Sequence, residues 1–368
     1  MFRTREKIKP FEKKLLVVTL LLVLTGLVVV ASASVVLSFQ RFERTGYYIE
    51  RQAIFAGIGI LLMFIFSRLD YHRYRRGAVL IFALSALLLV AVLLPQIGFQ
   101  VGNSRRWINL GSFFLQPSEF AKLGLIILLA AWFDTKKEQL GTMFTTLLPP
   151  LFFTGLIAGL VILEPDFGSM AAILLIALAM FYAGGVSFSH LLYLAIAGVG
   201  FGWLAIQMAP YRLARISSFL EPAADPLGAG YQVQQALLAI GSGGVWGQGL
   251  GESRQKFNFL PEPIGDSIFA VMSEEFGFVR VVIVLCMFLV FALLGLALAR
   301  RAPDNFARLL AVGITMWVAA QVIVNIGAML GILPLTGITL PFISYGGSSL
   351  IALLIGVGIM LNISRHRV

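Results

Sequence analysis

The sequence predicts an all-α integral membrane protein with about ten transmembrane helices. Hydrophobic residues make up 59% of its 368 residues and charged residues only 12%, and the mean hydropathy is +0.91. A soluble globular protein carries about 25% charged residues, so this chain has too few charges to cover a water-exposed surface. Its apolar residues are also gathered in long runs, which is typical of membrane-spanning helices.

A helix needs about 20 predominantly apolar residues to cross the hydrocarbon core of a bilayer. The first apolar run follows a basic N-terminal segment and is longer than the core of a cleaved signal peptide, so we expect it to remain as the first span. The apolar runs predict helices at residues 15–37, 48–66, 78–94, 113–133, 143–163, 166–184, 190–209, 281–299, 308–330 and 346–362.

The basic residues predict the topology. With the N-terminus inside, most of the Lys and Arg residues between the apolar runs fall in cytoplasmic segments, as the positive-inside rule requires. The prediction is one polytopic domain over residues 1–368, with both termini inside and a large external loop at residues 210–280, between the seventh and eighth helices. These loop charges account for the net charge of +10, so no nucleic-acid partner is predicted. Cys286 is the only cysteine and excludes an internal disulfide.

The loop at residues 210–280 is expected to carry function, because long loops without a simple flexible composition usually do. From Asp266 to Ala299 the pattern fits one helix, but its length of roughly 50 Å exceeds a hydrocarbon core of about 30 Å. We therefore expect residues 281–299 to cross the lipid and Asp266 to be reachable from water. Its carboxylate has two interpretations, a helix cap or a sheltered general base, and composition favours the cap.

Other ionisable residues lie at or near membrane depth, where charges are costly and often functional. Glu119 and Lys122 share a helix face, either as an internal ion pair or in a cavity where Lys122 meets an anion such as pyrophosphate. Arg106 lies just before that helix, beside Trp107, and an interfacial anchor is favoured over phosphate capture. We expect Asp166 to cap the helix that follows it.

Residues 331–349 form an uncharged, apolar segment that Pro and Gly interrupt. Irregular backbone at membrane depth is tolerated where it lines a cavity or is buried in protein, so we expect a re-entrant segment that caps a cavity. The sequence has no Walker P-loop, no HExxH motif and no Cys/His cluster. Nothing in it indicates ATP-driven transport, haem or a zinc site.

Three stretches in the same chain resemble one family, the SEDS family of bacterial peptidoglycan glycosyltransferases. They are Arg106-Trp107 with Gln116–Glu119 and Lys122, the segment Phe219–Gly244, and Leu340–Ser349. The resemblance covers nearly the whole chain and implies ten helices. The stretch Gly249–Phe257 resembles the division branch (FtsW-like) more than the elongation branch (RodA-like).

The resemblance implies polymerisation of lipid II into glycan strands at the outer face of the bacterial cytoplasmic membrane, with release of undecaprenyl pyrophosphate. It identifies Asp266 as the general base and reverses the preference for a cap. The family usually has His-Thr before this Asp and an aromatic residue after it, whereas Ile264, Gly265 and Ser267 stand here. The implied substrate-binding residues are Arg106, Glu119, Lys122, Arg215, Ser344 and Tyr345.

No cofactor is identified with certainty, and a divalent cation (Mg²⁺ or Mn²⁺) is the one candidate, as an alternative source of positive charge for the leaving pyrophosphate. The implied partners are a class B penicillin-binding protein and other divisome or elongasome membrane proteins. A lipid II flippase is the alternative from another functional class, with Glu119 and Lys122 as its pathway. Such a flippase should tolerate loss of Asp266 better than loss of the Glu119–Lys122 pair. A structural divisome scaffold should tolerate both.

Overall fold

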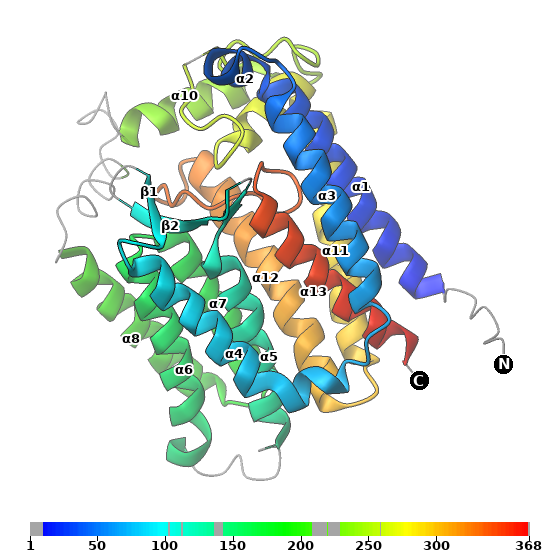
Figure 1. Ribbon diagram of the computed structural model, residues 1–368, viewed down its shortest axis with the longest axis vertical. Coiled ribbons are helices and arrows are strands. Elements are labelled where there is room, and N and C mark those ends of the chain that lie inside the picture. The colour runs from blue at the N-terminus through cyan, green and yellow to red at the C-terminus, as the bar shows by residue number, and fades with distance from the viewer. Residues whose placement is uncertain are drawn as a thin grey trace.

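The computed structural model describes residues 10–101, 104–111, 113–135, 143–207, 219, 229–257 and 259–366. The described residues form ten long helices, and Figure 1 shows how they pack into a bundle. Their bounds are α1 (Pro10–Ala33), α3 (Tyr47–Phe66), α4 (His72–Leu93), α5 (Pro117–Thr135), α6 (Met143–Leu163), α7 (Phe167–Ala183), α8 (Phe188–Gln207), α11 (Ile268–Arg300), α12 (Asn305–Met329) and α13 (Gly347–Arg365). Each overlaps one of the ten predicted apolar runs.

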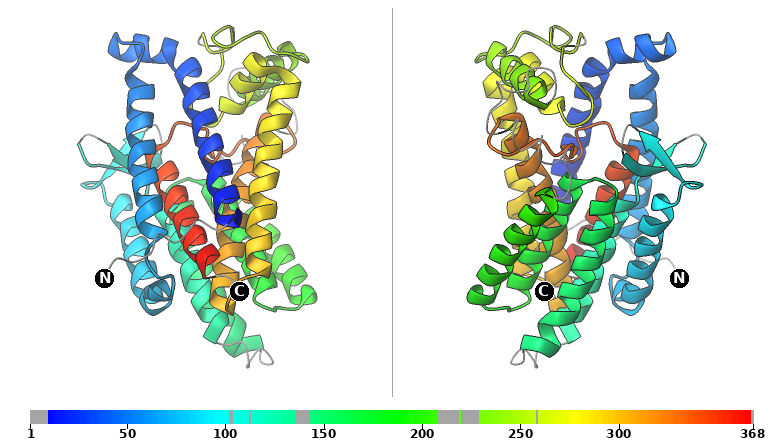
Figure 2. Two further views of the ribbon diagram at one scale, coloured as in Figure 1. Left: turned by 90° about the vertical axis from the view of Figure 1, so that its right-hand side faces the viewer. Right: turned by 90° about the vertical axis from the view of Figure 1, so that its left-hand side faces the viewer.

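Six of these helices are long and apolar enough to cross a membrane by length and composition: α1, α3, α4, α11, α12 and α13. The chain is therefore a multi-pass membrane protein. The start of α1 and the end of α13 lie at the same end of the bundle (Figures 1 and 2), as the predicted placement of both termini on one side requires.

Two shorter helices lie at the opposite end of the bundle, which we call the α10 end (Figure 1). They are α2 (Val35–Phe42) and α10 (Ala229–Ser242). The predicted helix at 15–37 thus begins and ends too late, because α1 runs from Pro10 to Ala33 and the chain then turns into α2. The loop at residues 210–280 contains a helix of its own, α10, which the apolar runs did not predict. Arg215 lies outside the described residues.

A small antiparallel sheet precedes α5 and was not predicted. Its strands are β1 (Gly98–Val101), β2 (Ser104–Asn109) and β3 (Phe114–Leu115), in the order β1-β2-β3. The predicted start of a helix at residue 113 is wrong, because Phe114 pairs with Asn109 across the sheet. The helix begins instead at Pro117, and proline is favoured at the first position of a helix because its missing N–H needs no partner there.

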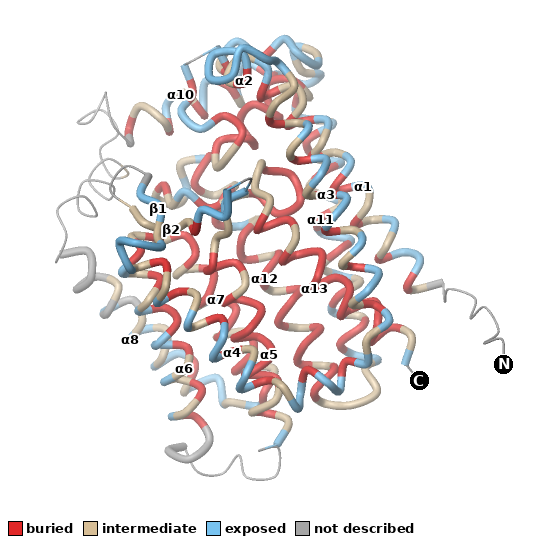
Figure 3. The backbone as a smooth tube through the Cα atoms, in the orientation of Figure 1, coloured by how far each residue is buried: buried red, intermediate tan, exposed pale blue. Residues whose placement is uncertain are grey.

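The core of the bundle is formed by α5, α12 and α13, most of whose residues are buried, while α3 and α4 lie at its periphery (Figure 3). Of the membrane-length stretch of α13, 83% of the residues are buried, against 22% for α3. The exposed residues of α3 include apolar side chains such as Ile54 and Leu61. In a bilayer these side chains contact lipid and need no cover from protein.

The helix α11 has a break near its first third. Gly277 has φ 72° and ψ 174°, so the backbone is not helical there. A Cβ at this position would collide with the backbone of Trp246 and Gly247, so only glycine allows the close approach. The break lies before residues 281–299, the part expected to cross the lipid, and separates them from the first turns of α11.

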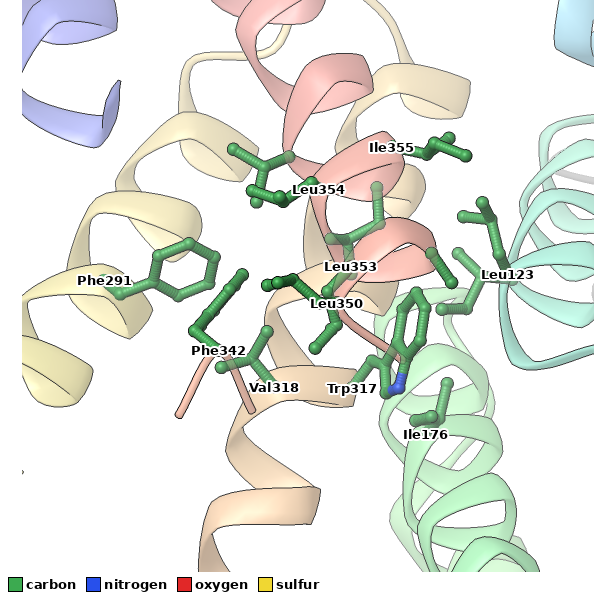
Figure 4. Packing of buried hydrophobic residues seen from close by; sticks show 14 of the residues in the cluster. Leu123, Ile176, Phe291, Trp317, Val318, Phe342, Leu350, Leu353, Leu354 and Ile355 are labelled. Atoms are coloured by element: carbon green, nitrogen blue, oxygen red, sulfur yellow. The ribbon is translucent and has the colours of Figure 1, made fainter. Parts of the chain in front are cut away.

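The segment between α12 and α13, residues 331–346, contains no helix or strand and is largely buried. Figure 4 shows Phe342 of this segment beside Phe291 of α11 and Val318 of α12, with 5.7 Å between the ring centroids of the two phenylalanines. On another side its backbone presses against Gly26 of α1, where a Cβ would collide with the Phe342 carbonyl. The segment is anchored in the core, so it is held firmly where it meets the residues around Asp266.

Candidate active site

Asp266 lies in a tight turn directly before α11. The carbonyl oxygen of Glu262 accepts hydrogen bonds from the backbone N–H groups of Gly265 (3.0 Å) and Ser267 (3.3 Å). The N-cap residue of α11 is Ser267, whose side chain forms no capping hydrogen bond. Asp266 precedes this N-cap residue and is partly exposed.

Side chains and backbone from two other segments fix this turn. Asn325 of α12 donates from Nδ2 to the carbonyl oxygens of Asp266 and Ile338, both at 2.8 Å. Ser344 donates from Oγ to the Gly265 carbonyl at 2.7 Å, and the Tyr345 N–H donates to the Ile264 carbonyl at 2.8 Å. Buried backbone carbonyls need such partners, and here the partners also tie the turn to the segment 331–346.

The carboxylate itself has polar neighbours. Gln232 of α10 donates from Nε2 to Asp266 Oδ2 at 3.3 Å and to Ser267 Oγ at 2.9 Å. The Ser267 hydroxyl lies 3.5 Å from Asp266 Oδ1. The position after Asp266, where the family usually has an aromatic residue, is thus occupied by a serine that forms a bridge between the carboxylate and α10. These bonds orient the carboxylate and leave it facing a cavity.

The cavity has a volume of ≈ 450 Å³ and lies among α2, α3, the sheet, the Asp266 turn and the segment 331–346. Its wall contains two carboxylates, Glu262 and Asp266, and three arginines, Arg41, Arg51 and Arg106. Most of the remaining wall is aromatic or aliphatic. The arrangement can hold an anionic, partly apolar ligand with an acid–base group beside it.

Arg106 connects the sheet to the turn between α6 and α7. Its Nε donates to the Glu164 carbonyl oxygen at 3.1 Å, and a terminal N–H donates to the Pro165 carbonyl oxygen. The guanidinium is therefore anchored on one side while its side chain lines the cavity. The Asp166 side chain accepts from the Ser169 N–H at 3.0 Å and caps α7, which confirms that prediction.

The side chain of Glu164 is an unusual neighbour of this arginine. It is fully buried, and neither carboxyl oxygen has a hydrogen-bond partner among the described residues. Burial raises the pKa of Glu164 to about 9, with a smaller rise from the charge of Asp166 that Arg106 opposes. The carboxyl is therefore neutral at pH 7, which removes most of the cost of burying it.

Glu119 and Lys122 form a buried ion pair in α5, with 2.7 Å between Lys122 Nζ and Glu119 Oε1. Lys122 Nζ also lies 5.6 Å from the centroid of the Trp317 ring, a cation–π distance. The Lys122 side chain is 0% exposed, and neither residue is part of the cavity wall described above. Of the two interpretations that the sequence allows for Glu119 and Lys122, this geometry fits the internal ion pair.

The structure therefore brings together only some of the residues that the sequence resemblance assigns to the base and to substrate binding. Asp266, Arg106 and Tyr345 line the cavity. Ser344 lies behind the Asp266 turn, where its hydroxyl donates to the Gly265 carbonyl and accepts from the Leu340 N–H at 2.8 Å.

Sequence reasoning missed Gln232, Asn325, Glu262, Arg41 and Arg51. The sequence does contain a signal for Asn325, because an amide within an apolar run must find a hydrogen-bond partner inside the protein. Under the positive-inside rule Arg41 and Arg51 are simply external charges. Their position on the cavity wall depends on how α2 and α3 fold over the Asp266 turn.

Divalent cations prefer carboxylate and phosphate oxygens. Within the described ranges no group of three or more His, Cys, Asp or Glu side chains forms a candidate metal site. Glu262 and Asp266 share the cavity wall, and Mg²⁺ is commonly held by one or two carboxylates together with substrate phosphates. The two carboxylates fit a cation that is held jointly with a phosphorylated substrate, and they do not form a complete protein site.

Comparison with protein families decides the identity of the chain. Residues 12–368 match the family model of the FtsW/RodA/SpoVE cell cycle proteins. The chain belongs to this family. The match spans all the helices and the Asp266 turn, so the resemblance found in the sequence is confirmed.

Two relatives are similar over almost their whole length. Stage V sporulation protein E of Bacillus subtilis (strain 168) is 41% identical over 364 residues, which are 99% of each chain. A probable peptidoglycan glycosyltransferase FtsW of Trichlorobacter lovleyi is 39% identical over 361 residues, covering 97% of this chain and 95% of the relative.

Solved structures in the family share the fold. A chain from a peptidoglycan synthase complex that coordinates polymerisation and crosslinking superposes with a TM-score of 0.79 at 31% identity, covering 96% of this chain and 97% of that chain. The rod shape determining protein RodA of Thermus thermophilus gives a TM-score of 0.71 at 30% identity, covering 96% of each chain.

Proposed function

We propose that this family member is a peptidoglycan glycosyltransferase that polymerises lipid II into glycan strands. The names of its FtsW relatives support this activity. The observation that carries the proposal is the cavity in which Asp266 lies with three arginines. Glycosyl transfer from a lipid diphosphate needs a base for the acceptor hydroxyl and positive charge for the leaving group, and this cavity offers both.

In the proposed reaction the Asp266 carboxylate accepts the proton of the 4-hydroxyl on the N-acetylglucosamine of an acceptor lipid II. The hydroxyl oxygen then forms a bond to the anomeric carbon of the lipid-linked donor. The bond between that carbon and the diphosphate oxygen breaks, and undecaprenyl pyrophosphate leaves with the electron pair. Proton removal by a positioned base typically contributes about 10²–10⁴-fold to the rate.

The surrounding residues have supporting roles in this proposal. Gln232 and Ser267 hold the carboxylate in one orientation through their hydrogen bonds. Arg106 contributes positive charge from the wall formed by β2. A divalent cation would be held by Glu262, Asp266 and substrate phosphates, and it would supply further positive charge to the leaving group. No nucleotide is required, because the donor already carries its leaving group.

The proposal also covers placement and partners. The chain is a single polytopic domain in the bacterial cytoplasmic membrane, with both termini inside and residues 210–280 outside. The α10 end, with the cavity, then faces the outer leaflet. A class B penicillin-binding protein is the expected partner, together with other divisome or elongasome proteins. The similarity to a chain of a synthase complex that coordinates polymerisation and crosslinking supports this partnership.

The test is a polymerisation assay with the purified full chain, alone and with its cognate transpeptidase, in the presence of lipid II and Mg²⁺ or Mn²⁺. Wild type should produce glycan polymer on a gel. Asp266→Asn should reduce the rate by about 10²–10⁴-fold, since the amide cannot accept the proton. Glu252→Gln is the matched control, because Glu252 is an exposed carboxylate in the same region and is not part of the cavity wall.

Melting temperatures in detergent check that Asp266→Asn remains folded. Polymer formation by folded Asp266→Asn at the wild-type rate would contradict the role of this carboxylate. If wild type makes no polymer under any partner or metal condition but moves lipid II across liposomes, the flippase becomes the better interpretation. In that case substitution of the Glu119–Lys122 pair should reduce transport more than substitution of Asp266.

A further inference from the structure

The cavity has a second basic wall, formed by α2 and α3, which the mechanism above does not use. Arg41 of α2 donates to the Tyr48 hydroxyl at 3.2 Å. The guanidinium carbon of Arg51, on α3, lies 4.7 Å from the centroid of the Tyr47 ring. Tyr48 in turn meets Tyr345 edge to face, with 5.0 Å between the ring centroids. Aromatic side chains therefore position both arginines.

Neither Arg41 nor Arg51 has a carboxylate partner among the described residues, in contrast to their close neighbour Arg44. Arg44 forms an ion pair with Glu50 at 3.1 Å, and both side chains are mostly exposed. Across the described part of the chain, no ion pair involves Arg41 or Arg51. The two positive charges that face the cavity thus remain available for an anion, whereas the outward charge of Arg44 is already compensated.

The position of these arginines is fixed relative to Asp266. Gln52, next to Arg51 in sequence, is 1% exposed. It donates from Nε2 to the Ser344 carbonyl at 3.2 Å and accepts from the Gly346 N–H at 3.3 Å. Ser344 also holds the Asp266 turn. One hydrogen-bonded chain therefore connects α3 to the backbone of the Asp266 turn, and the α2–α3 wall forms part of the same site.

The apolar neighbours of the two arginines indicate the class of ligand. Leu37 lies one turn from Arg41 on α2, and Phe55 lies one turn from Arg51 on α3, and both line the cavity. Beyond them α3 presents exposed apolar side chains such as Ile54 and Ile58, which contact lipid. A ligand that combines a phosphate group with a polyprenyl chain matches this sequence of surfaces, from guanidinium to apolar wall to lipid.

We propose that Arg41 and Arg51 form a diphosphate subsite for a polyprenyl-linked saccharide, separate from the positive charge of Arg106. The inference rests on the proposed function, because joining two lipid-linked saccharides brings two diphosphates to one cavity. Guanidinium groups suit this role because their planar N–H pairs bind phosphate oxygens in a bidentate manner. Arg106 already uses two N–H groups on backbone carbonyls, so it does not supply both sites.

Binding of farnesyl pyrophosphate to the purified full chain in detergent tests the subsite without requiring polymerisation. Inorganic pyrophosphate and farnesol are measured beside it, to separate the contributions of the diphosphate and the prenyl chain. The double variant Arg41→Gln/Arg51→Gln should bind farnesyl pyrophosphate at least tenfold more weakly, and farnesol as wild type does. Arg44→Gln and Arg105→Gln are matched controls and should bind as wild type, since neither residue lines the cavity.

Arg51→Lys keeps the charge but loses the planar fork and the stacking on Tyr47, so it should weaken binding less than the double variant. Wild-type affinity of the folded double variant for farnesyl pyrophosphate would overturn the subsite. In the polymerisation assay the double variant should raise the apparent KM for lipid II more than it lowers kcat. If wild type makes no polymer but its diphosphate binding depends on these arginines, the proposed function fails and the subsite stands.

Discussion

Asp266 and Lys122 are both charged residues in an apolar chain, but the structure places them in opposite surroundings. Asp266 lies in a turn outside the helices, is partly exposed to a cavity, and has donors on both sides of its carboxylate. Lys122 lies within α5, has no exposure, and is paired with Glu119 at 2.7 Å. The first charge can meet a substrate, whereas the second is fully engaged inside the bundle.

The Lys122 ammonium and the Asp266 carboxylate differ in the free energy needed to separate each from its partners. A charge in a dry core is tolerated only while its partner stays in place, so Lys122 is tied to the packing of α5 against Trp317 of α12. A carboxylate in a hydrogen-bonded turn next to water can exchange its partners at low cost. Between two candidate charges in a membrane protein, the one held by polar backbone at a cavity is the better candidate for proton transfer.

The largest expected effect on stability comes from breaking the buried pair. Lys122→Met should lower the free energy of unfolding by about 3–5 kcal/mol, because it leaves the Glu119 carboxylate buried without a partner. The double variant Glu119→Gln/Lys122→Met removes both charges and should recover most of that loss. Thermal unfolding of the two variants in detergent measures the difference. If the single and double variants are equally stable, the pair is not removed from water, which would contradict its burial in the structure.

The next effect concerns the support of Asp266. Asn325→Ala removes the donor to two backbone carbonyls, those of Asp266 and Ile338, and each buried unsatisfied group costs about 1–3 kcal/mol. We expect a lower melting temperature and a lower polymerisation rate. Gln321→Leu is the matched control one helical turn away on α12. Its side-chain nitrogen and oxygen have no partner among the described residues, so this change should not reduce stability.

If Asn325→Ala and Gln321→Leu have equal effects on the polymerisation rate, Asn325 has no specific role in holding the Asp266 turn.

The smallest effect, taken over a single pH unit, concerns Glu164, a buried carboxyl next to Arg106 that has no hydrogen-bond partner among the described residues. Burial raises its pKa in the folded chain to about 9, from the 4.5 of an ordinary glutamate. As the pH rises from 4.5 to 9, the unfolded chain releases the proton and the folded chain keeps it. Stability should therefore fall by up to about 1.4 kcal/mol per pH unit in that window.

Glu164→Gln should remove this part of the pH dependence and raise the melting temperature at pH 8. Melting curves of wild type and Glu164→Gln between pH 6 and 9 give the comparison, with Glu50→Gln as a control for an exposed carboxylate. The same pH dependence in wild type and Glu164→Gln would mean that the carboxyl is ionised in the fold.

The apolar runs alone were sufficient to locate the ten long helices of the described residues, and six of these meet the length and composition that the bilayer requires of a spanning helix. Helix ends were less accurate. Residues 113–115 read as the start of a helix because they are apolar, but they pair as β3 with β2. The sheet and α10 were missed because the strands of 2 to 6 residues and the helix of 14 residues are too short to form a long apolar run.

The sequence by itself determined the class of protein, the positions of its helices, the family and the identity of Asp266 as the candidate base, because hydropathy and short motifs are local properties of the chain. Tertiary structure alone decided which charges share a cavity. Asp266, Arg106, Arg41 and Arg51 come from four different elements, while Lys122, in the same motif region as Arg106, lies in the core. Contacts between distant segments depend on how the helices pack, and no local pattern records them.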